Sequence, residues 1–293
     1  MHAVIVLFLA TTLPGSVADT PPVDPVVAAL RAATVTGIYE EPVELVGGRY
    51  QSEPLVEGSP VRRSLVLVPY LHHTGDLDGD GEEEVAAYLE ENSGGTGHFL
   101  HAALFELQGD SLVTTSTHWI GDREQIRRSR LEGRTVVLDL IAHGPNDPGC
   151  CPNQLQRRHL KVNDAGRFEQ RREVLGEASA DVLDHTAWVL RGFEYLGEPV
   201  EIEVTLRFEG ERIFGSAGCN RFEATFVTPR RRELQIRHPI STKKMCPPEV
   251  MEVEDRFLAL LPHVTQWNFL AGRLALLYVV GDDPPRSLVF ERL

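Results

Sequence analysis

Apolar and polar residues alternate along much of the chain in short segments. A period of two is typical of β-strands that have one buried face. Four such segments occur in the first half, at 64–71, 98–107, 111–120 and 134–143. The pairs Gly109-Asp110 and Glu132-Gly133 lie between segments, and such pairs favour the tight turns of antiparallel hairpins. The first half is therefore predicted to be mainly β.

The second half repeats this pattern and adds one helix. Apolar residues alternate with polar ones from Val200 to Phe208. A helix is predicted to begin at Pro247-Pro248 and to end at Pro262, because proline is tolerated in a first turn but stops a helix. Its apolar face consists of Val250, Val253, Phe257 and Leu260 or Leu261. Three strand-like segments follow, at 264–270, 273–280 and 286–292. The pattern predicts a second antiparallel β domain with a single packed helix.

The boundary between the two β regions is placed in a polar stretch. Residues 163–185 contain few large apolar side chains, and the chain length of 293 residues suits two domains. The predicted fold class is mainly β (α+β), with two antiparallel β domains. The predicted segments are a signal peptide at 1–18, a flexible leader at 19–36, an N-terminal β domain at 37–165, a linker at 166–184 and a C-terminal domain at 185–293.

The first residues are typical of a secretory signal. An uncharged apolar run extends from Ala3 to Leu13, and the small residues Ser16-Val17-Ala18 suit cleavage before Asp19. The run is shorter than the roughly 20 apolar residues that span a bilayer. No cysteine lies near the cleavage site, so we expect no lipid attachment and no stable membrane anchor. The expected location is the periplasm or the cell exterior.

Composition and charge narrow the range of partners. The formal net charge is −14, from 43 acidic and 29 basic residues, and a negative field repels phosphate backbones. Nucleic acid is therefore excluded as an expected partner. The hydrophobic content of 42% and the charged content of 25% are ordinary for a packed soluble protein.

The segment GDLDGDGEEE at 75–84 has the spacing of a cation-binding loop. Asp76, Asp78 and Asp80 occupy its first, third and fifth positions, and Gly81 allows a turn at the sixth. Glu82 offers its backbone carbonyl at the seventh position and Glu84 a carboxylate at the ninth. The twelfth position is Ala87 instead of glutamate, and the preceding segment is strand-like, so the loop is not an EF-hand. Calcium is the expected ion, and a solvated Asp-Gly turn is the alternative.

Four cysteines in an exported chain indicate a disulfide framework with three connectivities. The simplest pairing is local, with Cys219 joined to Cys246 in the second domain and Cys150 to Cys151 in the first. The bridge between Cys219 and Cys246 is predicted to stabilise the second domain by roughly 3 to 4 kcal/mol. Two free thiols, available as metal ligands, remain the alternative for Cys150 and Cys151.

Two patterns that carry chemistry in other proteins are weak here. Ser241 and Lys244 form an S-x-x-K, but they precede a helix in a strand-like segment, and no S-D-N or K-T-G accompanies them. Histidines are frequent in the first half, but no zinc-binding spacing connects them. They are His72, His73, His98, His101 and His143. We therefore expect no enzymatic activity.

Five elements occur in order in the second half: Trp188, GSAGCNRF at 215–222, STKKMCPP at 241–248, EDRFLALL at 254–261 and GRLALL at 272–277. On these elements the second half resembles the META domain, the HslJ-like family of bacterial envelope proteins. The resemblance implies a compact, mostly antiparallel β domain with one packed helix. The family is linked with heat shock, antibiotic tolerance, secretion and motility, and it brings no established catalytic residues.

The first half resembles a region of uncharacterised bacterial envelope proteins. The resemblance rests on residues 75–97, on GDR at 121–123 and on HGPNDPGCCPNQ at 143–154. It implies that EEEVAAYLEE at 82–91 is a strand, although alanine, leucine and glutamate favour helix. Together the features predict a non-catalytic envelope protein with a binding or structural role, whose partner is a protein or another envelope component. The alternatives are a periplasmic hydrolase, dependent on serine or a metal, and an inhibitor or adaptor.

Overall fold

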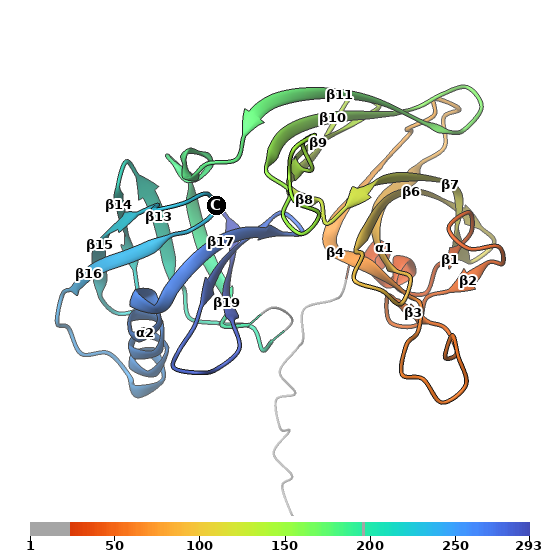
Figure 1. Cartoon of the computed structure of the whole chain (residues 1–293). Helices are drawn as coiled ribbons and strands as arrows, with labels where there is room; N and C mark the ends of the chain where they lie inside the picture. Colours follow the sequence, from red (N-terminus) through yellow and green to blue (C-terminus); the bar gives the residue numbers. More distant parts are fainter. Residues whose placement is uncertain (1–23, 195–196) are drawn as a thin grey trace, which may run out of the picture.

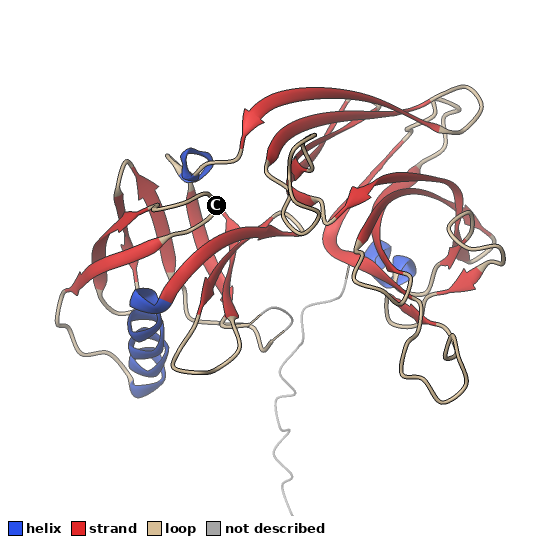
Figure 2. Ribbon diagram, in the orientation of Figure 1, coloured by secondary structure: helices blue, strands red, loops and turns tan. Residues whose placement is uncertain are grey.

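A computed structural model describes residues 24–194 and 197–293. The predicted signal peptide lies outside the described residues. Strands dominate the described chain, and Figure 2 shows one long helix, in the C-terminal half. The N-terminal and C-terminal halves form separate β bodies that meet along one side (Figure 1). The predicted fold class, mainly β with antiparallel sheets and one packed C-terminal helix, is confirmed.

The N-terminal half contains two sheets. Its elements are α1 (Pro25–Leu30), β1 (Thr34–Val35), β2 (Val43–Glu44), β3 (Arg49–Gln51), β4 (Ser64–Gly75), β5 (Glu84–Asn92), β6 (Phe99–Gln108), β7 (Ser111–Asp122), β8 (Gln125–Glu132), β9 (Thr135–Ala142), β10 (Gln154–Val162) and β11 (Phe168–Glu177). The first sheet has the order β2-β1-β7-β6-β5-β4-β3, and the second has the order β11-β10-β9-β8. The predicted turns at Gly109 and Gly133 are present, and both glycines have the positive φ that such turns require.

Strand β5 explains why a helix-favouring composition forms a strand. Val85, Ala87 and Leu89 pack with the apolar side of α1, whereas Ala86 and Tyr88 pack against the second sheet. Both faces of this part of the central sheet are therefore buried, so the run from Val85 to Leu89 is continuously apolar and shows no alternation. The long-range packing outweighs the local helix propensity.

Two predicted irregular segments are ordered. Residues 24–36 were predicted as a flexible leader, but they contain α1 and β1, and Leu30, Ala33 and Val35 are buried. Residues 166–184 were predicted as a linker, but β11 pairs with β10 along its length as an edge strand. Edge strands can be polar because their outer face is solvated, which is why β11 has the composition of a linker.

The C-terminal half is one sheet of eight strands with the order β16-β15-β14-β13-β12-β19-β18-β17. The elements are η1 (Ala180–Leu183), β12 (Ala187–Gly192), β13 (Thr205–Glu209), β14 (Arg212–Ser216), β15 (Arg221–Val227), β16 (Gln235–Ser241), α2 (Pro248–Leu260), η2 (Leu261–His263), β17 (Val264–Leu270), β18 (Arg273–Tyr278) and β19 (Arg286–Arg292). The helix and the last three strands match the prediction. The strand predicted from Val200 begins only at Thr205.

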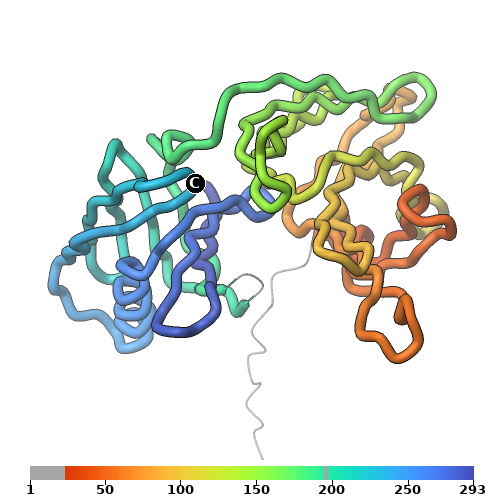
Figure 3. Tube along the Cα trace, in the orientation of Figure 1, coloured from red at the N-terminus to blue at the C-terminus, as the bar shows by residue number. Residues whose placement is uncertain are grey.

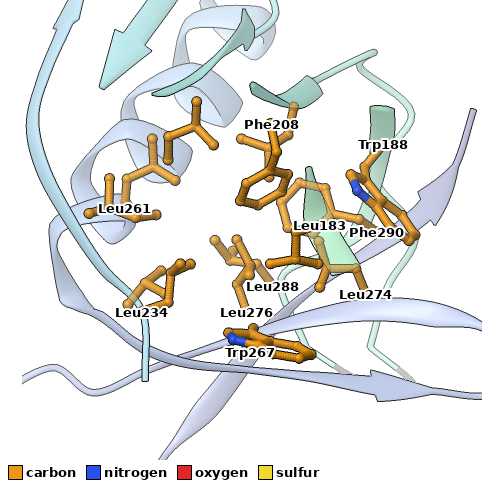
Figure 4. Packing of buried hydrophobic residues seen from close by; sticks show 14 of the residues in the cluster. Leu183, Trp188, Phe208, Leu234, Leu261, Trp267, Leu274, Leu276, Leu288 and Phe290 are labelled. Atoms are coloured by element: carbon orange, nitrogen blue, oxygen red, sulfur yellow. The ribbon is translucent and has the colours of Figure 1, made fainter. Parts of the chain in front are cut away.

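This sheet closes on itself. The backbone N–H of Leu234 donates to the carbonyl of Thr265 at 2.9 Å, and the N–H of Trp267 donates to Arg232 at 3.1 Å. These bonds join the segment before β16 to β17, the strand at the other end of the sheet order. Figure 4 shows the enclosed core, where Trp188, Phe208 and Phe290 converge with several leucines. Leu183, within the predicted linker, belongs to this core and is fully buried.

Candidate functional site

A hollow lined by many residues lies where the two halves meet. It is a groove of about 880 Å³ with walls from both halves. The second N-terminal sheet covers the first at Ala86 and Tyr88, but farther along β5 the side chains of Glu90 and Asn92 line the groove. Val66, Val68 and Leu100 complete an apolar floor. The tube in Figure 3 shows β17 and β18 reaching toward the N-terminal half beside this region.

A bulge in β4 forms one wall of the groove. The pairing with β5 passes from Leu67 opposite Leu89 to His72 opposite Ala87, so four residues of β4 stand against one of β5. Within the bulge Tyr70 has a positive φ of 68° and is 61% exposed. A left-handed backbone at a tyrosine is uncommon and is held by its surroundings. Here the guanidinium of Arg273 lies 3.6 Å from the centre of the Tyr70 ring.

The hairpin between β17 and β18 forms the opposite wall. Leu270 pairs with Arg273, and the two turn residues Ala271 and Gly272 have φ values of 50° and 80°. A two-residue turn of this kind suits the twist of a hairpin. The N–H of Gly272 donates to the carbonyl of Ile126 at 2.9 Å, and a Cβ at Gly272 would lie 3.3 Å from Leu71. Glycine therefore permits both the turn and the close contact with the N-terminal half.

Gln125 connects the two halves through its side chain. Its amide oxygen accepts from the backbone N–H of Phe269 at 3.2 Å and from the guanidinium of Arg232 at 2.5 Å. Burial lowers the pKa of Arg232 to about 10. This guanidinium also lies over the ring of Trp267. The junction therefore contains specific polar bonds as well as apolar contacts.

A buried acid lies in the wall of the groove. Glu124 forms an ion pair with Arg158 at 3.3 Å, and both side chains are only 5% exposed. Its second carboxylate oxygen has no hydrogen-bond partner in the described part of the chain. Burial raises the pKa of Glu124 to about 7, although the charge of Arg158 opposes this shift. The folded chain therefore holds the Glu124 proton to a higher pH than an exposed glutamate does.

The predicted cation loop connects β4 to β5. It brings ligand oxygens of Asp76, Asp78 and Glu84 within 4.8 Å of one another. Glu84 is buried and accepts from the N–H of Leu77 at 2.7 Å and from the N–H of Asp78 at 3.3 Å. Burial is the main cause that raises the pKa of Glu84, and the charges of Asp78 and Asp80 add to it.

The other two predicted ligands lie at the exposed side of the loop. Asp80 and Glu82 are outside the group of converging oxygens, and Asp80 accepts from the N–H of Glu82 at 2.8 Å. The guanidinium of Arg134 lies against Gly79, and its Nε donates to the carbonyl of Leu77 at 3.4 Å. Three carboxylates in this arrangement suit a hard cation with oxygen ligands, and Arg134 balances part of their charge.

The C-terminal half contains a closed polar network around one buried acid. Glu254 in α2 accepts from the N–H of Cys219 at 3.1 Å, the N–H of Asn220 at 2.6 Å and the side-chain amide of Asn220 at 2.7 Å. The amide oxygen of Asn220 accepts from Thr242 at 2.8 Å and from the N–H of Lys244 at 2.7 Å. A disulfide joins Cys219 to Cys246 beside this network.

Three separate sequence segments therefore meet at this network. They are 215–222, 241–248 and 254–261, the stretches on which the resemblance rests. Residues 181–286 match the family model of the META domain. The META domain part of the resemblance is thereby confirmed, whereas the resemblance of the N-terminal half stays a prediction. In the META domain, these segments contribute bonds that hold the loop before β15 to α2.

Two further comparisons add little. No curated protein matched the chain. A solved structure described as an NMR structure of a protein from Burkholderia xenovorans is 20% identical, over 39% of this chain and 86% of that one, with a TM-score of 0.31. A TM-score of this size does not establish a shared fold.

The residues examined for catalysis lie apart. Ser241 ends β16, and Lys244 lies in the following exposed loop, where its backbone bonds to Asn220. No hydrogen bond joins their side chains among the described residues. The histidines also have separate partners. His73 contacts Ser129 at 2.6 Å, His98 contacts Glu90 at 2.7 Å, His101 contacts Glu91 at 3.3 Å and His72 lies 3.6 Å from Asp24. The His143 side chain forms no hydrogen bond within residues 24–194 and 197–293.

The second cysteine pair forms a vicinal disulfide. Cys150 and Cys151 are bonded to each other in the exposed loop between β9 and β10, so local pairing is confirmed for both bridges. Asp147 accepts from the N–H of Gly144 at 2.8 Å and of Asn153 at 2.7 Å, which shapes this loop. These bonds lower the pKa of Asp147. Arg123 donates to the carbonyl of Gly149 at 3.1 Å, so the loop is attached to the rim of the groove.

Sequence reasoning missed the groove and two buried acids. Glu124 and Glu254 are each a single glutamate in a segment with no chemical motif. For Glu254 a signal was present: it occurs between Val253 and Phe257 on the predicted apolar face of the helix. A glutamate at that helical position indicates a buried carboxylate with fixed donors. No comparable signal marks Glu124.

Proposed function

We propose that this protein is exported to the bacterial envelope and acts there by binding, without catalysis. The groove at the domain junction is its binding site. The observation that carries the proposal is that one hollow of about 880 Å³ has walls from both domains. Ligand sites are commonly concave, mostly apolar, a few hundred Å³ in size and located at domain interfaces.

Two further features support this proposal. The disulfides Cys150–Cys151 and Cys219–Cys246 are typical of proteins in oxidising compartments. No helix in the described residues is long and apolar enough to cross a membrane. Because the META family is linked with stress tolerance and secretion, we include a role in one of these processes in the proposal. An inhibitor or adaptor that presents the META domain to a partner protein would also bind that partner at the groove.

A periplasmic hydrolase is the competing class, and one observation favours it. His98 and Glu90 form a hydrogen-bonded pair in the groove, and Ser64 lines the same groove. A base oriented by a carboxylate is one part of a nucleophilic site. The other part is a bond from serine to histidine, and none joins Ser64 to His98 among the described residues. Binding is therefore the better-supported function.

The test captures envelope components with three forms of the mature full chain. Val66→Lys places a cation on the groove floor, and Val174→Lys places the same cation on the exposed outer strand β11. A component recovered by the wild type and by Val174→Lys, but lost with Val66→Lys, would establish groove binding. Equal recovery by all three forms would contradict it. Labelling of Ser64 or Ser241 by a fluorophosphonate would identify a hydrolase instead.

We infer in addition that the acidic loop binds calcium in a structural role. Asp76, Asp78 and Glu84 supply its carboxylates, and Asp80 and Glu82 complete the oxygen set from the exposed side. Supporting this, all three converging acids accept bonds from loop N–H groups, so much of the geometry exists before an ion binds. The ion would fix the turn between β4 and β5.

A further inference from the structure

The outer face of four META strands carries an unusual concentration of positive charge. Arg207, Phe214, Glu223 and Ile240 are cross-strand neighbours in one row, and Glu209, Arg212, Thr225 and Arg237 form the next. Arg221 follows, opposite Ser216 on one side and bonded to Thr242 on the other. Residues of the opposite parity, such as Phe208, Ile213 and Phe222, fill the core. All these polar side chains therefore point outward.

We name this surface the basic face and define it as the outward residues of β13 to β16 with the loop at 242–246. Only one of its cations is neutralised by contact, since Arg212 pairs with Glu223 at 2.8 Å. The other five form no ion pair within residues 24–194 and 197–293. They are Arg207, Arg221, Arg237, Lys243 and Lys244. In a chain with a net charge of −14, such a surface is a local exception.

Exposed apolar side chains lie among these cations. Ile240 is 68% exposed and Met245 is 86% exposed, and Met245 directly follows Lys243 and Lys244. A depression of about 380 Å³ opens in the same face, lined by Arg212, Arg221, Glu223 and Ile240 among others. Guanidinium donors suit phosphate oxygens, and exposed apolar groups beside them suit the acyl boundary of a bilayer.

We propose that the basic face docks the protein onto the surface of an anionic phospholipid membrane. The cations attract the phosphate headgroups, and Ile240 and Met245 enter the interface. The remaining acidic surface is repelled by the same membrane, so the attachment has one orientation. The inference is independent of the groove, because its residues come from another part of the META domain. The apolar side chains distinguish a membrane from a soluble anionic polymer, which offers no apolar layer.

Vesicle flotation with the mature full chain tests the charge contribution. The chain should bind vesicles containing phosphatidylglycerol and should not bind phosphatidylcholine alone. The variant Arg221→Glu with Lys243→Glu and Lys244→Glu should lower the partition coefficient at least roughly a hundredfold, since each cation contributes about fivefold. The matched control changes three exposed cations of the β10–β11 hairpin that form no ion pair among the described residues: Lys161→Glu, Arg167→Glu and Arg171→Glu. It should bind within a few-fold of the wild type.

A second pair of variants tests the apolar contribution. Ile240→Ser with Met245→Ser should weaken vesicle binding about tenfold or more and leave binding to soluble polyphosphate unchanged. The control Leu107→Ser with Val174→Ser removes exposed apolar groups elsewhere and should change neither. Absence of binding to phosphatidylglycerol vesicles would overturn the proposal. Equal effects of the charge variant and its control would also overturn it. So would vesicle binding that polyphosphate abolishes while Ile240→Ser with Met245→Ser has no effect.

Discussion

The polar network inside the META domain and the junction between the two halves differ in how completely their buried polar groups are bonded. In the META domain, hydrogen bonds of Asn220 and Glu254 connect three segments of the chain. The indole N–H of Trp188 donates to Thr186 at 2.6 Å. At the groove and the junction, several buried atoms have no partner in the described chain, among them Glu124 Oε2 and Arg127 Nε. The segments with recognisable sequence motifs therefore form a fully bonded interior. The buried polar atoms of the described chain that lack partners belong to residues outside those motifs.

The largest expected effect comes from removing the acid at the centre of the META network. Glu254→Ala leaves two backbone N–H groups and the Asn220 amide without their acceptor. It should lower the free energy of unfolding by about 3 to 5 kcal/mol, because buried donors keep their desolvation cost. The exposed Glu252→Ala in the same helix should change it by less than about 0.5 kcal/mol. Denaturant unfolding of both variants is the measurement, and similar values would contradict a closed network.

The two disulfides sharpen the comparison, because one closes a loop and the other does not. Replacing Cys219 and Cys246 by serine should cost roughly 3 to 4 kcal/mol, since the bridge closes a separation of 27 residues. Replacing Cys150 and Cys151 should cost less than about 1 kcal/mol, because the bridged residues are adjacent. Non-reducing peptide mapping must first recover both local pairs. Equal losses of stability would show that the exposed loop has a larger structural role than its place suggests.

The META half could be predicted closely because its local signals agree with its packing. The spacing of apolar residues and the positions of the prolines predict the helix between Pro248 and Leu260 and the strands β17 to β19. The N-terminal half was harder, since β5 is buried on both faces and β11 is a polar edge strand. Neither has the alternation that marks a strand with one buried face.

The candidate sites divide in the same way. The acidic loop was visible in the sequence because its ligands are local, and three of the five predicted ligands converge. The groove arises from the β4 bulge and the β17–β18 hairpin, which are about 200 residues apart in sequence. No local pattern predicts that encounter. Glu124 acquires its raised pKa only from that packing.

The acid at the groove should make the stability of the N-terminal half depend on pH. The pKa of Glu124 rises from 4.5 to about 7 in the folded chain. Between these values the unfolded chain is ionised and the folded chain retains its proton, so stability falls as pH rises from about 4.5 to about 7. The loss is on the order of 3 kcal/mol and is complete above the folded pKa.

Glu124→Gln tests this dependence. Glutamine keeps an oxygen for Arg158 and cannot ionise, so the variant should gain stability relative to the wild type as pH rises. Denaturant unfolding of the wild type and the variant at about pH 5 and about pH 8 gives the difference in stability at each pH. The exposed variant Glu169→Gln on β11 should leave the profile unchanged. If the Glu124→Gln difference were the same at both pH values, Glu124 would be ionised throughout in the folded chain.

The next largest effect on stability should come from moving the N-terminal end of a META fragment. Ala178 and Leu183 pack into the META core although they precede the predicted start at residue 185. A fragment 178–293 should fold alone with a cooperative transition. A fragment 185–293 should be less stable by about 2 to 3 kcal/mol, the contribution of burying a leucine side chain. Insolubility of both fragments beside a stable full chain would mean that the halves share one core.

Calcium should produce the smallest effect and should act on the N-terminal half alone. Extracellular calcium modules bind at roughly 0.1 to 1 mM, and an ion at ten times its Kd stabilises the folded state by about 1.4 kcal/mol. The melting transition of the N-terminal half should therefore rise by a few degrees in calcium and return in chelator. Magnesium should have less effect, because a flexible carboxylate loop suits the larger ion.

Two variants assign this effect to the loop. Asp78→Asn should abolish the calcium shift, and in chelator it should raise the melting temperature slightly, because one carboxylate of the converging group is removed. The neighbouring Glu83→Gln, exposed and outside the group, should keep the full shift. If the wild type melts at the same temperature in calcium and in chelator, and calorimetry detects no binding at millimolar calcium, the loop is a polar turn. Its N–H bonds to Asp76, Asp78 and Glu84 would then be sufficient to shape it.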